Sequence, residues 1–230
     1  VRFNPNLAGA FTGQITHEST SVIKNLSLAG RGIDPYVQNF DDPSVLSNSG
    51  WTQYNLAGTA NKWTYTTTAR NVNSGTGAVL MNGYSDSGAS KDWLISPKLH
   101  LDTFTQFALL SFYSRKFYAG PSLKLMVSTN YDGVSSPETA TWTEIDGKFP
   151  TTTGTFKQSQ FINLEAYKSN STYVAWVYES GLNGAADSAL VVGVSQSRSG
   201  RRFRWQEGGK SEGSNSERGI EDGKCNERRH

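Results

Sequence analysis

Short runs of alternating apolar and polar residues follow one another along most of the chain, separated by clusters of Gly, Asn, Asp and Ser. The runs are rich in Thr, Val, Tyr, Phe and Trp, which favour strands. No stretch longer than two turns places apolar residues at helical spacing. Ten segments are predicted to be strands: 37–40, 51–55, 62–67, 78–81, 92–96, 106–113, 122–128, 141–144, 158–163 and 173–178. The pattern predicts an all-β fold, a jelly-roll β-sandwich.

Two features of the pattern predict what the sandwich buries. Every residue from 173 to 178 is apolar or aromatic. This segment is therefore expected to be a central strand that is covered on both faces. Trp93 and Trp176 each lie within such a strand segment, so both are predicted to be core residues.

The first 33 residues form a separate small unit of three predicted strands, 1–3, 10–17 and 25–30. The spacing of its Phe, Pro, Leu and Gly residues resembles the last strands of an immunoglobulin-like repeat of large bacterial surface proteins. Three strands cannot bury a sandwich core alone, so we expect these to be the C-terminal strands of such a domain, with other domains of a longer polypeptide around them. Pro35 favours an extended linker before it. The main domain is predicted to span 34–195.

Charge divides the chain near residue 195. Up to Ser195 there are thirteen Lys and Arg against fourteen Asp and Glu, and from Gln196 onward there are nine against six. Seven of the eleven arginines fall in this last segment, which has few apolar residues. We interpret 196–230 as a disordered or frame-shifted tail. Nucleic-acid binding is not expected, because acidic residues interrupt the basic run after Glu207. No apolar run is long enough for membrane insertion.

Several segments of the main domain, in order, resemble the cleaved-adhesin or choice-of-anchor J domains of Bacteroidota surface proteins. The most specific are Asp92-Trp93-Leu94-Ile95-Ser96-Pro97 and Val127-Ser128-Thr129-Asn130-Tyr131. The resemblance covers roughly residues 37–190. It implies a jelly-roll sandwich, an extracellular or outer-membrane surface location, and a binding role beside other modules. The family's closing strand usually carries a Trp and paired Asp residues, and these are missing after Asp187.

The residues do not favour catalysis. The single cysteine, Cys225, lies in the tail, and His100 is the only histidine of the main domain. There is no Gly-x-Ser-x-Gly motif, and the carboxylates stand mostly in turn sequences, where Asp bonds the backbone. We therefore expect no enzyme activity.

Calcium is the cofactor that the same carboxylates suit best, since Ca²⁺ takes oxygen ligands from loops. Asp41 and Asp42 end the first strand segment of the main domain, and Asp187 precedes the last. The resemblance implies calcium support near these strands. The alternative is that the carboxylates are plain turn acceptors.

Aromatic residues outside the predicted core are the candidate ligand contacts, because a ring can stack on a sugar. Trp63 and Tyr65 alternate with polar residues and are expected to be an exposed or cleft pair. Phe117 and Tyr118 are a second pair, on a loop between two strands.

These observations predict a non-catalytic extracellular adhesion or carbohydrate-binding module of a larger secreted or surface protein. Its expected partner is a glycan or a host or matrix surface protein. The alternative is an accessory domain of a secreted peptidase, nuclease or glycan hydrolase whose catalytic domain lies outside this chain. A structural spacer without a ligand is a third interpretation.

Overall fold

The computed structural model describes residues 9–32, 34–58, 62–83, 88–118, 122–181 and 188–196. The predicted first strand, 1–3, and the tail beyond residue 196 lie outside the described residues. Among the described residues, no helix has the length and apolar character needed to cross a bilayer.

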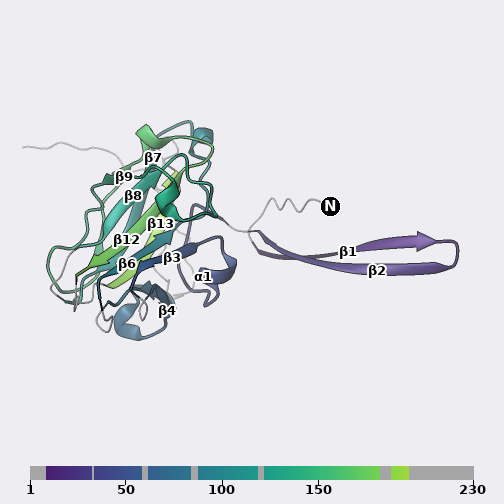
Figure 1. The fold of residues 1–230 in the computed structure, drawn as a ribbon, viewed down its shortest axis with the longest axis horizontal. Helices are drawn as coiled ribbons and strands as arrows, with labels where there is room; N and C mark the ends of the chain where they lie inside the picture. The colour runs from purple at the N-terminus through teal and green to yellow at the C-terminus, as the bar shows by residue number, and fades with distance from the viewer. Residues whose placement is uncertain are drawn as a thin grey trace, which may run out of the picture. The chain divides into compact units, whose positions relative to one another are not determined.

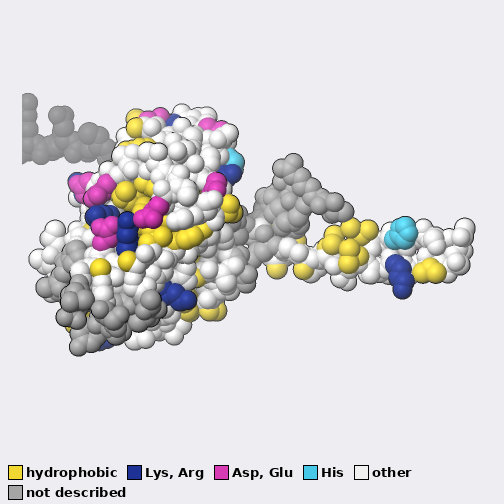
Figure 2. Space-filling view, viewed as in Figure 1, with side chains coloured by type: hydrophobic (Ala, Val, Ile, Leu, Met, Phe, Trp, Pro, Cys, Tyr) yellow, Lys and Arg dark blue, Asp and Glu magenta, His cyan; other side chains and the backbone are white. Residues whose placement is uncertain are grey.

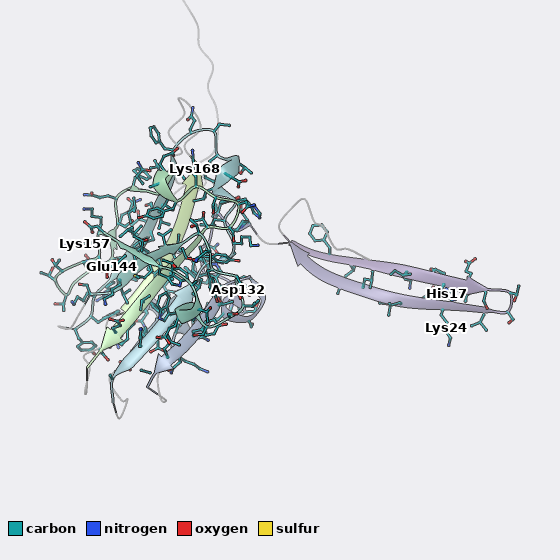
Figure 3. The ribbon with its side chains drawn as sticks, turned by 45° about the horizontal axis from the view of Figure 1, so that its top comes forward. His17, Lys24, Asp132, Glu144, Lys157 and Lys168 are labelled. Carbon is teal, nitrogen blue, oxygen red and sulfur yellow. The ribbon has the colours of Figure 1, made fainter. Side chains whose placement is uncertain are left out.

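A two-stranded hairpin forms the N-terminal unit (Figure 1). β1 (Gly9–Ser19) pairs antiparallel with β2 (Val22–Gly32), which contain the predicted strands 10–17 and 25–30. Ile15 lies opposite Leu26, so one face of the hairpin is apolar, while the cross-strand pair His17 and Lys24 lies near its turn (Figure 3). Leu26 is 61% exposed. The hairpin therefore has an apolar face that its own two strands do not cover.

The main domain is a sandwich of two antiparallel sheets (Figure 1). One sheet has the order β3-β6-β12-β8-β9, and the other β10-β7-β13-β5-β4, with β11 also paired to β7. The chain passes repeatedly between the sheets, as a jelly roll requires. The predicted all-β jelly-roll sandwich is confirmed. The strands are β3 (Thr52–Ala57), β4 (Thr64–Thr66), β5 (Ala78–Leu80), β6 (Ser90–Ile95), β7 (Ala108–Arg115), β8 (Lys124–Ser128), β9 (Thr143–Ile145), β10 (Lys157–Gln158), β11 (Ile162–Asn163), β12 (Tyr173–Ser180) and β13 (Ser188–Gln196).

Helical structure among the described residues is limited to short segments in the connections. They are α1 (Val45–Asn48) and the 3₁₀ turns η1 (Ala69–Asn71), η2 (Leu101–Thr103), η3 (Pro137–Thr139) and η4 (Glu165–Tyr167). Each is a turn or two long, which agrees with the absence of helical periodicity in the sequence.

Two predicted strands differ from the structure, and one observed strand was not predicted. Residues 37–40 form no strand, because Phe40 adopts a left-handed backbone (φ 58°) that turns the chain and buries its ring. The segment 158–163 divides into β10 and β11 at Gln160, which has a φ of 64°. β13 was not predicted, yet it pairs with β7 from Ser188 to Gln196 and with β5 at Leu190. The segment that departs from the family's closing strand thus still occupies a central place in its sheet.

The core lies between the two sheets and is organised around Trp176 of β12. Trp176 is fully buried, and its ring centroid lies 5.6 Å from that of Trp51 and 5.5 Å from that of Phe112 on β7 of the opposite sheet. β12 is the middle strand of its sheet, and its residues are buried from Tyr173 to Tyr178. The predicted central strand is confirmed.

A second aromatic cluster covers the outer face of the β12 sheet. Trp142 packs on Trp93 and Tyr131 at centroid distances of 5.1 and 5.4 Å, and Tyr131 meets the edge of Tyr173 at 5.1 Å. Trp93 is 5% exposed. The connection between β8 and β9 supplies Tyr131 and Trp142, so this loop closes the outer side of the sheet. Both faces of β12 are covered for this reason, and Trp93 is a core residue as predicted.

Candidate binding groove

The sequence predicts Trp63 and Tyr65 to be an exposed or cleft pair, and for Trp63 this is wrong. Its side chain is 1% exposed within the main core, and its Nε1 donates to the backbone oxygen of Asp92 at 3.3 Å. Tyr65 is half-buried, and its hydroxyl donates to the backbone oxygen of Asp41 at 3.1 Å. Trp63 directly precedes β4 and Tyr65 lies within it, and both side chains are turned inward, whereas Thr64 between them is exposed. This pair therefore cannot form an open stacking platform.

Phe117 and Tyr118 follow β7 and differ in what surrounds them. The guanidinium carbon of Arg115 lies over the Phe117 ring, 4.0 Å from its centroid, and that of Arg70 lies 5.7 Å away. The Phe117 ring is thus engaged by cations of the same chain. Tyr118 is 55% exposed. Of the four aromatic residues predicted to bind a ligand, Tyr118 is the one whose ring is largely exposed.

The predicted calcium ligands Asp41 and Asp42 serve the turns in which they lie. Asp41 accepts hydrogen bonds from the Thr76 amide at Oδ1, 2.6 Å, and from Asn39 Nδ2 at Oδ2, 2.7 Å. Asp42 Oδ1 accepts from the amide and hydroxyl of Ser44 at the start of α1. Donors thus point at both oxygens of Asp41, an arrangement that satisfies the carboxylate without a cation.

Asp187, the third predicted calcium ligand, lies outside the described residues. Within the described ranges no three His, Cys, Asp or Glu side chains gather as a metal site would require. Calcium at this loop stays a prediction.

An open groove of about 530 Å³ lies along β8, β9 and the loop that follows β9. Figure 2 shows acidic and basic side chains interleaved around exposed apolar atoms over these strands. The groove is lined by Ser122, Leu123, Lys124, Leu125, Glu144, Ile145, Asp146, Gly147, Lys148, Phe149 and Thr151. We name this surface the β8–β9 groove.

The floor of the groove is apolar and belongs to the edge of the main core. Leu123 is 9% exposed, and Ile145 and Phe149 are half-buried against the core. The Phe149 ring packs on Phe112 with centroids 5.2 Å apart. A side chain at Gly147 would clash with that ring, since a Cβ there would lie 2.3 Å from Phe149 Cε2. Glycine at this position therefore allows the ring to lie close against the loop.

The rim of the groove continues a row of alternating charges across the outer face of the sheet. Lys91, Glu179, Lys124 and Glu144 lie on the adjacent strands β6, β12, β8 and β9. Lys124 Nζ donates to Glu179 Oε2 at 2.5 Å, and Lys91 Nζ lies 3.9 Å from Glu179 Oε1. The hydrogen bond to Glu179 raises the pKa of Lys124 above its usual value, and the charges of Glu179 and Glu144 add to this. Lys124 therefore stays charged at the groove, which Glu144 also lines.

The loop after β9 brings a second pair of opposite charges to the rim. Asp146 Oδ1 accepts from the Lys148 amide at 2.9 Å, and its Oδ2 accepts from Lys148 Nζ. These bonds lower the pKa of Asp146. Lys148 has a left-handed backbone, with φ 52°, that closes the turn over its partner. Asp146 is thus charged at neutral pH.

A smaller hollow adjoins the groove on the side of β7. It shares Ser122, Leu123 and Phe149 with the groove, and its other lining residues are Ser114, Arg115, Lys116 and Pro150. The apolar floor is therefore shared between the β9 loop and the end of β7, where Arg115 and Phe117 meet.

Sequence reasoning missed the groove residues. Leu123, Lys124 and Phe149 come from segments that the alternation marks only as strand and turn, and no tryptophan draws attention to them. The available signal is the turn sequence Asp146-Gly147-Lys148-Phe149, in which an aromatic ring directly follows charged turn residues.

No protein-family model matches this chain, and no curated protein sequence matches it significantly. Solved structures match it at low identity. The K1 cleaved adhesin domain of Lys-gingipain from Porphyromonas gingivalis W83 gives a TM-score of 0.50 at 16% identity, over 70% of this chain and 97% of that one. The K3 cleaved adhesin domain of the same protein gives 0.47 at 18% identity, over 69% and 96%.

A structure of carbohydrate-binding modules from the β-sandwich superfamily gives a TM-score of 0.42 at 10% identity, over 84% of this chain and 75% of that one. Among these three structures, the K1 domain has the highest TM-score, and at 16% identity it shows a shared fold. The class that the structure defines is thus an all-β sandwich with the fold of a cleaved adhesin domain.

Proposed function

We propose that the sandwich is a non-catalytic binding module that holds a glycan in the β8–β9 groove and serves adhesion. The observation that carries the proposal is the groove itself, with an apolar floor around Phe149 and a rim of alternating charges. A sugar ring presents an apolar C–H face together with hydroxyl groups that both donate and accept hydrogen bonds. A concave site with an apolar floor and a few fixed polar groups matches that chemistry.

Each side chain of the groove has a definite part in this proposal. The Phe149 ring offers the apolar surface for the face of a sugar. Glu144 and Asp146 accept hydrogen bonds from sugar hydroxyls, and Lys124 and Lys148 donate to them. Lys124 and Asp146 are each held by a neighbouring charge, so the rim is ordered before a ligand arrives.

The setting of the module supports adhesion. The fold is shared with the K1 adhesin domain of Lys-gingipain, and the sequence segments around Trp93 and Tyr131 resemble the cleaved-adhesin family. We infer that the chain belongs to that family and works at the cell surface or outside the cell, as one domain of a longer polypeptide.

The proposal is tested by applying the full chain to a glycan array and titrating the best ligand by calorimetry. We expect binding that Glu144→Gln weakens about tenfold, the size expected for one charged hydrogen bond. Phe149→Ala should weaken it as well, whereas Phe161→Ala, at a 63% exposed ring outside the groove lining, should not. If the folded chain binds no glycan, or if Glu144→Gln and Phe149→Ala bind as the parent does, the proposal fails.

A further inference from the structure

Two arginines from separate segments meet at one ring beside the groove. Arg70 comes from η1, between β4 and β5, and Arg115 ends β7. Their guanidinium carbons lie 5.7 and 4.0 Å from the centroid of Phe117. Arg115 Nη1 also donates to the backbone oxygen of Arg70 at 2.6 Å, which ties the two segments together. The Arg115 side chain is therefore fixed from two directions, by the ring and by the carbonyl group.

The positive charge of this pair is not balanced within the described part of the chain. Among the described residues, no carboxylate lies within 4.0 Å of either guanidinium group, although four lysines there make such ion pairs: Lys91, Lys124, Lys148 and Lys168. Arg115 Nε is buried without a hydrogen-bond partner, and Arg70 is exposed. With Nε buried, the terminal nitrogens of Arg115 are the donors that remain for a planar anionic group.

The arginine pair adjoins the proposed binding surface. Arg115 lines the smaller hollow, which shares Ser122, Leu123 and Phe149 with the β8–β9 groove. A saccharide chain that covers the shared floor would thus have its next residue near Arg115. At the other end, Glu144 and Asp146 favour neutral hydroxyl groups, so the surface is polar at one end and cationic at the other.

We infer that the ligand is an acidic glycan, whose sugar carboxylate binds Arg115 and Arg70 while a neighbouring sugar lies in the groove. This inference rests on the proposed glycan function and names its ligand class. Arg115 supplies the terminal N–H donors that its bond to the Arg70 carbonyl leaves over, and Arg70 adds a second positive charge from an exposed position. Phe117 acts as a positioning residue, since it holds the Arg115 guanidinium rather than stacking on the sugar.

The test compares oligogalacturonate with its methyl ester, which has the same backbone without the charge. With the full chain, calorimetry should show oligogalacturonate binding at least about tenfold tighter than the ester, and more weakly as salt is raised. Arg70→Gln and Arg115→Gln should each remove most of this difference. Arg115→Lys should fail to restore it, because an ammonium group lacks the planar fork.

Lys98→Gln is the matched control, since it removes one positive charge at an exposed site outside both hollows. It should leave oligogalacturonate binding unchanged. Arg70 is exposed, so its variant is expected to fold even if Arg115→Gln is destabilised, and thermal melts verify this for both.

Equal binding of acid and ester would overturn the acidic ligand while leaving glycan binding intact. Equal weakening by Lys98→Gln and the arginine variants would also overturn it, because the effect would then be net charge alone. Absence of binding to every glycan, neutral or acidic, would remove the proposed function together with this inference.

Discussion

The carboxylate of Asp132 is held by Ser135, three residues later in the connection between β8 and β9. Asp132 Oδ1 accepts from the Ser135 amide at 2.8 Å, and its Oδ2 accepts from the Ser135 hydroxyl at 2.5 Å. The Val134 amide adds a bond to Oδ1 at 2.9 Å. These donors shape the loop that carries Tyr131 onto the outer face of the sheet, where its hydroxyl donates to the backbone oxygen of Ser135.

Acid should weaken this loop in a defined pH range. The hydrogen bonds from Ser135 and Val134 lower the pKa of Asp132 to about 2 from 3.8. The folded state therefore favours the charged form, and its stabilisation is present above pH 3.8 and lost as pH falls through about 2. We expect the urea midpoint of the parent to fall more steeply between pH 5 and pH 2 than that of Asp132→Asn. Ser135→Ala, which removes the hydroxyl donor, should show an intermediate slope, and parallel curves for all three would contradict the prediction.

Gly133 should be irreplaceable in the same loop. Its φ is 86°, and a Cβ there would lie 2.5 Å from the hydroxyl oxygen of Tyr173. Tyr173 is 5% exposed and cannot move aside freely. Gly133→Ala is expected to lower the free energy of unfolding by at least about 1–2 kcal/mol, from the left-handed backbone alone. Gly88→Ala, where a Cβ would meet nothing within 4 Å, is the control and should change urea stability little; equal effects at the two sites would refute the assignment.

Two roles of Asp41, as a hydrogen-bond acceptor in its turn or as a calcium ligand, can be told apart by experiment. Since Thr76 and Asn39 donate to both carboxylate oxygens at an exposed site, Asp41→Ala should lower the free energy of unfolding by about 1 kcal/mol through the hydrogen bonds that it removes. On the same grounds, millimolar Ca²⁺ should leave the thermal midpoint of the parent unchanged. A rise with Ca²⁺ that Asp41→Ala abolishes would instead establish the calcium site that the sequence predicts, because a ligand that binds only the folded state raises its midpoint.

Most strands, and the central one among them, could be predicted from the alternation of apolar and polar residues. This alternation follows directly from strand geometry, in which successive side chains point to opposite faces. The run from Tyr173 to Tyr178 is apolar on both faces, which permits only a strand covered on both sides. Alternation predicted strands less accurately where the backbone turns at a residue other than glycine. Phe40 and Gln160 both adopt left-handed backbone conformations, and neither Phe nor Gln is a residue type that predicts a turn.

Alternation also assigns residues to two faces without saying which face points inward. Trp63 and Tyr65 share a face, as the sequence indicates, but pairing with β5 turned that face toward the core. A shift of one residue in register would have reversed the outcome. The burial of Trp63 thus depends on the sheet and not on β4 alone.

The sequence by itself determined the all-β class, the central strand and the burial of Trp93 and Trp176, since each depends on local periodicity. The tertiary structure decided the candidate site. Lys124 faces Glu179 from a strand 55 residues away, and Arg70 meets Arg115 across 45 residues. Such contacts arise from the order of strands in the sheets and the path of the connections, which a sequence pattern read over a few residues does not contain.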